Sequence, residues 1–366
     1  MVTKTVHLIA AARPNFMKIA PLYHALAATD WCTPKIVHTG QHYDANMSDA
    51  FFSDLSMPEP FCHLNVGSGT HAEQTGGVMI EYEKIAMSDQ PDAVVVAGDV
   101  NSTVACAMVC AKLWIPVIHL EAGLRSGDRR MPEEVNRVMT DAISDLLWTP
   151  SPDGDENLLR EGVAPERIER IGNIMLDSYE MLRDRIAASG ARQGFGLAAG
   201  EYGVVTMHRP SNVDERATLE PLVEQLISAS QRLPLLFAVH PRTRKKLEEF
   251  DLLGRLQGAD AITLCEPLSY IEFMNLVTSA RMVISDSGGV QEETTYLKVS
   301  CLTVRENTER PITIMQGTNR LISPGQIAAT VDAELDSPAT ETRCPEFWDG
   351  KTAARATASL GRLLGV

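Results

Sequence analysis

Short apolar runs rich in β-branched residues alternate with longer amphipathic stretches along the whole chain. In the first half, the runs that predict strands are Val6–Ala10, Lys35–Thr39, Ala93–Ala97, Val117–Leu120 and Leu146–Thr149. Apolar residues recur at helical spacing between these runs, and the predicted helices are Phe16–Ala28, Thr70–Met87, Val100–Leu113 and Glu133–Leu147. Because strands that alternate with helices form βαβ units, this half predicts a parallel sheet with both faces covered.

The same alternation begins again in the second half. Its predicted strands are Gly203–Met207, Leu235–Val239, Ala261–Leu264, Met282–Ser285 and Ser300–Val304. Between the halves, a helical pattern over Asn173–Ser189 is followed by a Gly-rich linker, and Lys351–Leu364 predicts a last helix. We therefore predict an α/β protein of two Rossmann-like, doubly wound domains, which bind ligands at the carboxyl ends of their strands.

Composition agrees with two soluble domains. A chain of 366 residues exceeds the size at which one hydrophobic core keeps growing, and 44% hydrophobic with 22% charged residues is ordinary for a globular protein. The net charge of −15 argues against a nucleic-acid partner, which would need a basic face. A site for an anionic nucleotide must then be built locally from backbone N–H groups and a few cations.

Targeting signals are absent from the pattern. The first twelve residues lack the features of a signal peptide, and no apolar run approaches the length of a membrane span. The seven cysteines show neither metal-ligand nor disulfide spacing, which fits a reducing compartment. We expect a soluble, cytoplasmic protein with no membrane partner.

Charged side chains follow the predicted strands of the first half. Arg13 and Lys18 lie near the start of the first helix, where the helix dipole favours an anion. Asp99 and Glu121 follow two later strands, and Glu133 opens a helix. Asp99 also suits a helix cap and Glu133 a helix N-terminus, so a structural role stays open for both. If the three carboxylates converge at one sheet edge, they can divide the work of acid and base.

In the second half, Ser287-Gly288-Gly289 forms a turn between a predicted strand and a helix. The glycines let the backbone approach a diphosphate, whose charge meets the helix N-terminus. Glu293 lies about one and a half turns into that helix, where its carboxylate suits ribose hydroxyls.

Further basic residues follow other strands of the second half. His208 and Arg209 end one strand and suit a phosphate, and Arg310 lies in a later loop. His240 ends another strand, where a structural role is equally open. The chain has no Walker A, H-E-x-x-H or G-x-S-x-G sequence and no dinucleotide fingerprint.

Taken together, these segments resemble the non-hydrolysing UDP-N-acetylglucosamine 2-epimerases. The resemblance covers nearly the whole chain, and its motifs stand in the family's order. They are Ala12-Arg13-Pro14, Thr39-Gly40-Gln41-His42, Gly98-Asp99, His119-Leu120-Glu121-Ala122-Gly123-Leu124-Arg125, Pro132-Glu133-Glu134-Val135-Asn136-Arg137, Gly172-Asn173, His208-Arg209, Val239-His240-Pro241, Asp286-Ser287-Gly288-Gly289-Val290-Gln291-Glu292-Glu293 and Thr308-Glu309-Arg310-Pro311.

The resemblance implies a GT-B architecture with the active site in the cleft between the domains, a homodimer, and neither a cofactor nor a metal. It implies a first domain of residues 1–171 joined by a C-terminal helix, 349–366, and a UDP-binding domain of residues 172–348. It also implies reversible conversion of UDP-GlcNAc to UDP-ManNAc. In this reaction, anti elimination of UDP gives a 2-acetamidoglucal, and UDP then adds back with the opposite configuration at C2.

Roles follow by position from the same resemblance. Asp99, Glu121 and Glu133 are the acid/base carboxylates, and which of them takes the C2 proton stays open. His208 assists the departing UDP. The residues implied to bind the UDP-sugar are Arg13, Lys18, Arg209, His240, Ser287, Gly288, Gly289, Glu293 and Arg310.

The chain departs from the family at the site where some members bind a second, activating substrate molecule. Gln41 and Gln74 match that site, but Asp44 and Glu73 replace the Gln and Arg expected beside them. We therefore expect weak or absent activation, and hence a hyperbolic dependence of rate on substrate concentration.

Other functions stay open at this point. A 2-epimerase of another UDP-2-acetamido sugar, such as a 2,3-diacetamido uronic acid, would share the catalytic residues. A hydrolysing epimerase is less favoured, because Glu121–Arg125 follows the non-hydrolysing pattern. A GT-B glycosyltransferase would not exchange the C2 proton, and a nucleotide-binding module would not need three carboxylates.

Overall fold

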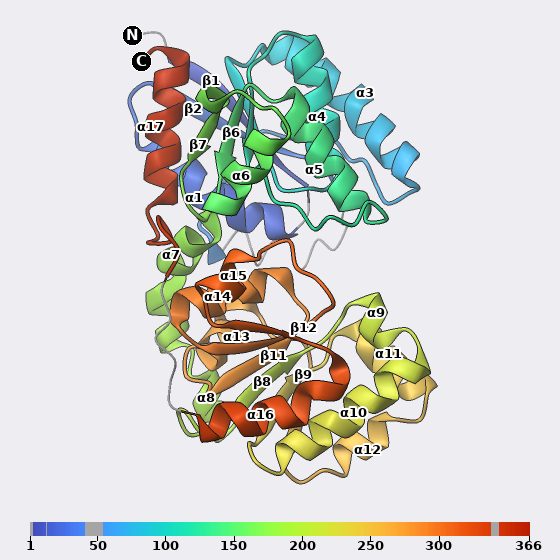
Figure 1. The fold of residues 1–366 in the computed structure, drawn as a ribbon. Coiled ribbons are helices and arrows are strands. Elements are labelled where there is room, and N and C mark those ends of the chain that lie inside the picture. Colours follow the sequence, from blue (N-terminus) through green and yellow to red (C-terminus); the bar gives the residue numbers. More distant parts are fainter. Residues whose placement is uncertain (1–2, 12, 41–53, 338–343) are drawn as a thin grey trace. The chain divides into compact units, whose positions relative to one another are not determined.

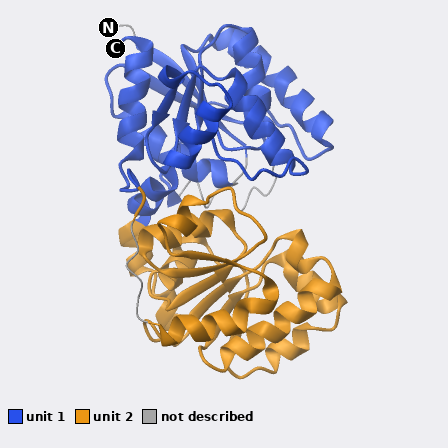
Figure 2. Cartoon of the chain, viewed as in Figure 1, with its two compact units in different colours: residues 1–182, 346–366 blue, residues 183–345 orange. Residues whose placement is uncertain are grey.

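The computed structural model describes residues 3–11, 13–40, 54–337 and 344–366, without the side chain of Arg13. The chain forms two compact units, shown in different colours in Figure 2. The first unit contains Met1–Leu182 and Glu346–Val366, and the second contains Arg183–Pro345. The boundary between them falls within helix α7 (Ile174–Ala188), close to the division after residue 171 that the resemblance implies.

The first unit is built on a parallel sheet with the strand order β3-β2-β1-β4-β5-β6-β7 (Figure 1). Its strands are β1 Lys4–Ala10, β2 Cys32–His38, β3 Cys62–His63, β4 Ala93–Ala97, β5 Val117–Leu120, β6 Leu146–Thr149 and β7 Ile168–Arg170. Its helices, besides α7, are α1 Arg13–Ala27, α3 His71–Asp89, α4 Asn101–Lys112, α5 Pro132–Ile143, α6 Pro152–Arg160 and α17 Thr352–Leu364. The chain reverses its winding between β1 and β4, which is the switch point where doubly wound sheets bind ligands.

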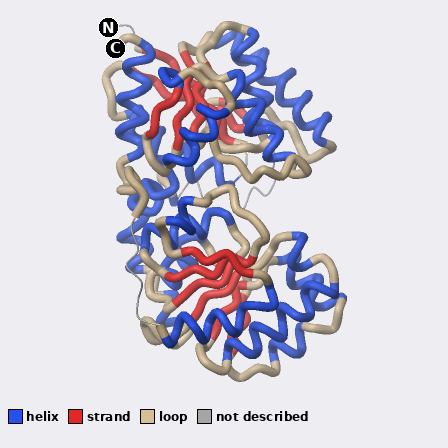
Figure 3. Tube along the Cα trace, viewed as in Figure 1, coloured by secondary structure: helices blue, strands red, loops and turns tan. Residues whose placement is uncertain are grey.

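The second unit repeats the plan with the strand order β10-β9-β8-β11-β12-β13. Its strands are β8 Gly203–Thr206, β9 Leu235–Ala238, β10 Ile262–Cys265, β11 Met282–Ser285, β12 Ser300–Val304 and β13 Asn319–Ile322. Its helices are α8 Ala191–Gly194, α9 Pro210–Val213, α10 Arg216–Ser230, α11 Pro241–Glu249, α12 Leu253–Gln257, α13 Tyr270–Val277, α14 Gly288–Leu297, α15 Ile312–Met315 and α16 Ile327–Asp336. In each unit the strands lie inside and the helices cover them (Figure 3).

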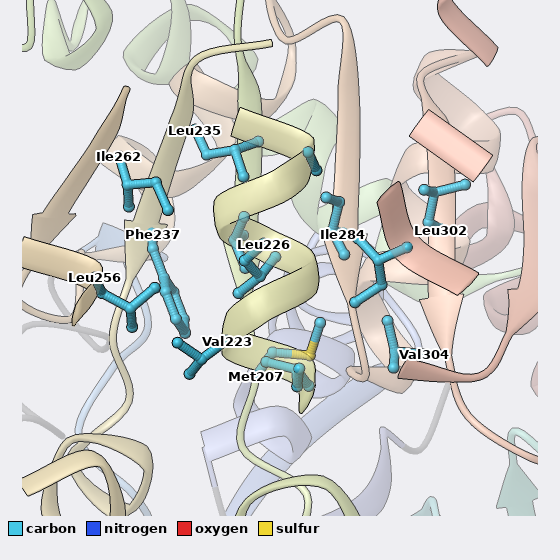
Figure 4. Close-up of a cluster of buried hydrophobic side chains, with 14 of the residues drawn as sticks. Met207, Val223, Leu226, Leu235, Phe237, Leu256, Ile262, Ile284, Leu302 and Val304 are labelled. Carbon is cyan, nitrogen blue, oxygen red and sulfur yellow. The ribbon is translucent and has the colours of Figure 1, made fainter. Parts of the chain in front are cut away.

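Burial follows this layered plan. Every residue of β4, β5, β6, β9 and β11 is buried, as expected for parallel strands covered on both faces. In the second unit, Val223 and Leu226 of α10 pack toward Phe237 of β9 and Ile284 of β11 (Figure 4). None of the helices in the described ranges has the length and apolar character that a membrane span requires.

Local sequence explains where several helices start. Proline occupies the first turn of α5, α6 and α11, where its missing N–H leaves no helical hydrogen bond unmade. Thr70 with Glu73 forms a capping box at α3, and Ser269 with Glu272 forms one at α13. Helix α5 ends at Ile143 rather than at the predicted Leu147, because Leu146–Thr149 forms β6.

The C-terminal helix α17 is part of the first unit and packs on α1. The Asp177 carboxylate accepts hydrogen bonds from the N–H groups of Thr352 and Ala353 at the start of α17, at 3.1 and 2.8 Å. Ser359 of α17 accepts a hydrogen bond from the indole N–H of the buried Trp148 at 2.9 Å. Buried polar contacts therefore fix the last helix on a sheet formed by the first half of the chain.

Candidate active site

A lysine and a carboxylate meet at the ligand edge of the first unit's sheet. Lys18 of α1 forms an ion pair with Glu121, which directly follows β5, and each side chain is only 10% exposed. The backbone of Gly98, at the end of β4, lies against both. A Cβ added there would stand 2.9 Å from Lys18 Nζ and 3.5 Å from Glu121 Oε2. Lys18 and Glu121 therefore meet beside Gly98, at the switch point of the sheet, whereas the sequence predicted convergence of Glu121 with Asp99 and Glu133.

Glu121 has a left-handed backbone conformation, with φ of 76°. Such a conformation costs about 1 kcal/mol for a residue other than Gly, and surrounding contacts must hold it. Here the N–H groups of Glu121 and Ala122 both donate to the carbonyl oxygen of Trp148, at 3.1 and 3.0 Å. The strained turn directs a functional side chain toward Lys18.

Asp99 is held at the same edge by a guanidinium group. Arg137 Nη2 donates to Asp99 Oδ2 at 2.6 Å, and Arg137 Nη1 donates to Glu134 Oε2 at 2.7 Å. The Glu134 carboxylate also accepts from the N–H groups of Ser126 and Gly127, both at 2.9 Å. Burial opposes ionisation of Glu134, but these N–H groups and Arg137 lower its pKa. Glu134 thus holds the backbone of Ser126 and Gly127 in place. The Asp99 side chain remains 30% exposed.

Glu133 lies in the first turn of α5 and is exposed. Among the described residues it has no hydrogen-bond or ion-pair partner, so the structure does not join it to Asp99 or Glu121. Of the two adjacent glutamates, Glu134 therefore has the structural role, and Glu133 remains accessible to a ligand.

Three sequence predictions concern residues outside the described ranges. The side chain of Arg13 and the residues Gln41 and Asp44 are not part of the description. Gln74 Oε1 accepts a hydrogen bond from Asn101 Nδ2 at 2.8 Å, and Glu73 belongs to the capping box of α3.

In the second unit, Asp286 organises the residues that follow β8. Its buried carboxylate accepts from the backbone N–H groups of His208 and Arg209, at 3.0 and 2.9 Å, and from Asn212 Nδ2 at 3.0 Å. It also contacts His208 Nδ1 at 2.8 Å. Burial opposes ionisation, but the hydrogen bonds and charge of His208 lower the pKa of Asp286. The buried Asp286 carboxylate therefore orients the ring of His208, whose side chain remains 39% exposed.

His240 stands beside His208, with 5.6 Å between the ring centroids. Its Nδ1 accepts a hydrogen bond from the N–H of Arg242, so it caps α11. Burial and the neighbouring His208 lower the pKa of His240. The structural role that the sequence left open for His240 is thus real, and the ring still lies next to His208.

The Ser-Gly-Gly turn opens α14, as the sequence predicts. Ser287 is its N-cap residue and makes no side-chain cap, so the first N–H groups of the helix lack an intrahelical partner. A Cβ at Gly288 would stand 2.9 Å from Arg310 Nη1, whereas one at Gly289 would meet nothing within 4 Å. The open helix N-terminus beside a guanidinium group suits an anion.

Two residues that the sequence reading missed support Arg310. Glu309 Oε1 accepts from Arg310 Nη1 at 2.6 Å, and Glu309 Oε2 accepts from the buried Arg305 at 2.7 Å. Arg209 Nη2 lies 3.9 Å from the same Glu309 carboxylate. Despite burial, Arg310 and Arg305 lower the pKa of Glu309 well below its usual range. Three guanidinium groups therefore gather around one carboxylate beside the turn.

Glu293 of α14 is 5% exposed, and burial raises its pKa to about 8 despite a hydrogen bond with Tyr270. Below about pH 4.5 the carboxyl is neutral in both the folded and the unfolded state. Between pH 4.5 and 8 only the unfolded state ionises, so the free energy of unfolding should fall as pH rises. We expect the loss to be about 1 kcal/mol per pH unit and to stop above pH 8.

Glu293→Gln should remove this contribution, and denaturant unfolding of both proteins between pH 5 and 9 measures it. The exposed Glu248→Gln is the matched control and should keep the wild-type slope. Equal slopes for wild type and Glu293→Gln would show that Glu293 is ionised in the folded protein.

Gly123 fixes the loop that follows Glu121. Its φ is 79°, and a Cβ there would stand 2.4 Å from the carbonyl oxygen of Gly154. Gly123→Ala should therefore abolish activity or folding, because backbone atoms cannot yield as a flexible side chain would. Gly127→Ala is the matched control, since Gly127 has a similar φ of 74° and open space around it. Gly127→Ala should lower the free energy of unfolding, measured with denaturant, by about 1 kcal/mol. Similar losses of stability for the two variants would show that the close approach of Gly123 to Gly154 is not what constrains this position.

No group of three or more His, Cys, Asp or Glu side chains in the described part of the chain could hold a metal ion. The polar residues at the carboxyl ends of the described strands differ between the two units. Carboxylates and Lys18 stand in the first unit, and cations and free helix N–H groups stand in the second.

Comparison with known proteins gives a consistent result. A family model described as UDP-N-acetylglucosamine 2-epimerase matches residues 24–361. The UDP-N-acetylglucosamine 2-epimerase of Methanocaldococcus jannaschii is 44% identical over 322 residues, which are 86% of this chain and 87% of its own length. The UDP-2,3-diacetamido-2,3-dideoxy-D-glucuronate 2-epimerase of Pseudomonas aeruginosa is 37% identical over 318 residues, or 86% and 87% of the two chains.

A crystal structure of the M. jannaschii UDP-GlcNAc 2-epimerase, in complex with UDP-GlcNAc and UDP, has a TM-score of 0.88 to this chain. The two are 40% identical, and the match covers 98% of this chain and 99% of the other. The predicted fold class, two parallel α/β domains of the GT-B type, is thereby confirmed. With a matching family model over most of its length and such relatives, the chain belongs to the UDP-N-acetylglucosamine 2-epimerase family.

Proposed function

We propose that this protein interconverts UDP-GlcNAc and UDP-ManNAc by reversible epimerisation at C2. The observation that carries the proposal is the Lys18–Glu121 pair against Gly98, the residue before Asp99, at the switch point of the first sheet. Two carboxylates at one edge supply an acid and a base, and the second unit supplies a separate anion-binding turn. Membership in the family supports the same reaction.

The proposed reaction balances without an oxidant or a cofactor. A carboxylate takes the C2 proton, and the electron pair of that C–H bond becomes the C1=C2 double bond of a 2-acetamidoglucal. The C1–O bond breaks, and its electron pair leaves with UDP. The reverse steps, with the proton delivered to the opposite face of C2, give the epimer. Asp99, Glu121 and Glu133 are the proposed acid/base groups.

Stabilisation of the leaving UDP falls to the second unit in this proposal. His208, oriented by Asp286, faces the developing charge, and the first N–H groups of α14 bind the diphosphate with Arg209 and Arg310. The neutral carboxyl that burial favours at Glu293 can both donate to and accept from ribose hydroxyls. Lys18 and Arg13 supply further positive charge, and His240 completes the group beside His208.

The test is proton NMR of the purified protein with UDP-GlcNAc in heavy water. Loss of the C2 proton signal together with formation of UDP-ManNAc would establish both the reaction and this substrate. A glycosyltransferase would not exchange that proton. Absence of exchange and product would refute the proposal for this sugar.

The similarity to the P. aeruginosa relative supports one alternative substrate, a UDP-2,3-diacetamido uronic acid. The residues proposed for catalysis would be the same, and only the contacts to C3 and C6 would differ. Exchange with that sugar and none with UDP-GlcNAc would favour the alternative.

We also propose a cytoplasmic homodimer. The seven free cysteines support a reducing compartment, and an apolar surface on α3 supports the dimer. Ile80 and Met87, seven residues apart on α3, are 60% and 61% exposed, and Trp114 after the neighbouring α4 is 94% exposed. Analytical ultracentrifugation tests the dimer, and a single monomeric species would refute it.

A further inference from the structure

A buried histidine and aspartate contact the backbone next to Asp99 and Glu121, two of the three candidate carboxylates of the first unit. His119 is the third residue of β5 and Asp141 belongs to α5, and both have a relative exposure of 0%. The distance from His119 Nδ1 to Asp141 Oδ1 is 2.5 Å, and that from His119 Nε2 to the carbonyl oxygen of Gly98 is 2.9 Å. Neither side chain can reach a substrate, so a role for the pair must act through its neighbours.

The partners of the ring determine how many protons it holds. A carbonyl oxygen only accepts, so Nε2 must carry a hydrogen toward Gly98. Burial opposes ionisation of Asp141, but His119 and the adjacent Arg125 lower its pKa, so it is a carboxylate that accepts from Nδ1. With Asp141 as the carboxylate, Nδ1 donates to Oδ1 and Nε2 donates to the Gly98 carbonyl oxygen, so the ring carries a hydrogen on each nitrogen.

The second oxygen of Asp141 extends the contact to the loop after β5. Asp141 Oδ2 accepts from the N–H of Gly123 at 3.1 Å and pairs with Arg125 Nη2 at 2.8 Å. The pair therefore joins the backbone at Gly98, directly before Asp99, to the backbone at Gly123, two residues after Glu121. The strained φ of Glu121 lies between these points and needs contacts of this kind to persist.

We propose that His119 and Asp141 are positioning residues for the epimerase reaction, acting as a buried imidazolium–carboxylate pair that sets the relative placement of Asp99 and Glu121. The pair fixes the Gly98 carbonyl from one side and the Gly123 N–H from the other. This inference rests on the proposed function for its catalytic consequence, but the state of the pair can be measured without any substrate.

The first measurement is NMR of the full-length protein labelled with 15N-histidine, at neutral pH. One imidazole should show protons on both ring nitrogens in strong hydrogen bonds, and this signature should disappear in Asp141→Asn. A wild-type protein in which every buried histidine is a neutral tautomer would overturn the proposal. This result does not depend on which reaction the protein catalyses.

The second measurement is kinetic and uses a matched control within the same sheet. His7 of β1 is also fully buried and lies 2.8 Å from Asp89, but this pair contacts neither Gly98 nor Gly123. Asp141→Asn should lower kcat about a hundredfold, while the affinity for UDP, which the proposed function assigns mainly to second-unit residues, changes less than about twofold. Asp89→Asn should lower stability but leave kcat per folded molecule near the wild-type value.

Equal kcat losses for Asp141→Asn and Asp89→Asn would reduce the pair to a merely structural role and overturn the proposal. An unchanged kcat in Asp141→Asn would do the same. If Asp141→Asn does not fold, His119→Gln gives the same kinetic comparison. A wild-type protein inactive on every UDP-sugar offered would instead refute the proposed function, and the NMR result would still show whether the pair is ionised.

Discussion

Glu121→Gln is expected to lower kcat for epimerisation about a thousandfold, because an amide can neither take nor deliver the proton at C2. The change keeps the size of a side chain that is nearly enclosed and paired with Lys18. UDP affinity should be largely retained, since most of the residues proposed to bind UDP lie in the second unit and Lys18 keeps its positive charge. Proton exchange at C2 in heavy water, measured beside equilibrium binding of UDP, separates the two effects.

Glu166→Gln is the matched control for this prediction. Glu166 is an exposed residue of the same unit that precedes β7, away from the carboxyl ends of the strands, and its variant should keep full activity. A Glu121→Gln protein with kcat within tenfold of wild type would exclude Glu121 as the acid or base. Asp99→Asn and Glu133→Gln, measured in the same way, would then rank the remaining carboxylates.

Asp286→Asn is expected to lower the stability of the second unit by about 3 kcal/mol and UDP affinity by more than tenfold. The Asn amide would present N–H groups to a set of donors, the backbone N–H groups of His208 and Arg209 among them. The amide keeps only one acceptor oxygen, so some of these donors would lose their acceptor inside a buried site, and His208 would lose part of its orientation. Denaturant unfolding and UDP titration measure the two losses.

The pH dependence supplies a second test of Asp286. Its pKa in the folded protein is lowered, so its stabilising contribution is present above the ordinary pKa and is lost as pH falls through the folded value. Asp286→Asn should therefore show a weaker acid dependence of unfolding below pH 4. Asp214→Asn, which breaks only a surface pair with Arg242, should change unfolding little. An effect as large as that of Asp286→Asn would contradict the assignment.

The central strands were predictable because burial on both faces requires a continuous apolar run, which can be recognised in the sequence. Predicted and observed bounds agree for β4, β5, β6, β11 and β12, each an apolar run covered on both faces. The strands β3, β7 and β13 were missed, and all three lie at sheet edges. These three edge strands are short or carry exposed polar residues, so no continuous apolar run marks them, whereas the edge strand β10 was predicted within one residue. Cys62–His63 and Ile168–Arg170 illustrate this.

Some residues of the candidate site could be predicted from the sequence, and others could not, for a similar reason. Residues that follow a strand, such as Glu121 and Ser287, could be located because the strand itself was recognisable. Their partners could not, because the pairings join distant parts of the chain. Lys18 and Glu121 are 103 residues apart, and Asp99 and Arg137 are 38 apart. No local pattern predicts which distant guanidinium or ammonium group meets a carboxylate.

The position of α17 has a consequence for how the chain is made. Because this helix completes the first unit, the ribosome must synthesise all of the second unit before the first can close. The surface that α17 covers on α1 and around Trp148 therefore stays exposed during translation, while the second unit, a continuous segment, is free to fold. Expression of residues 1–182 alone would leave that surface exposed permanently, so an isolated first unit requires 346–366 to be joined to it.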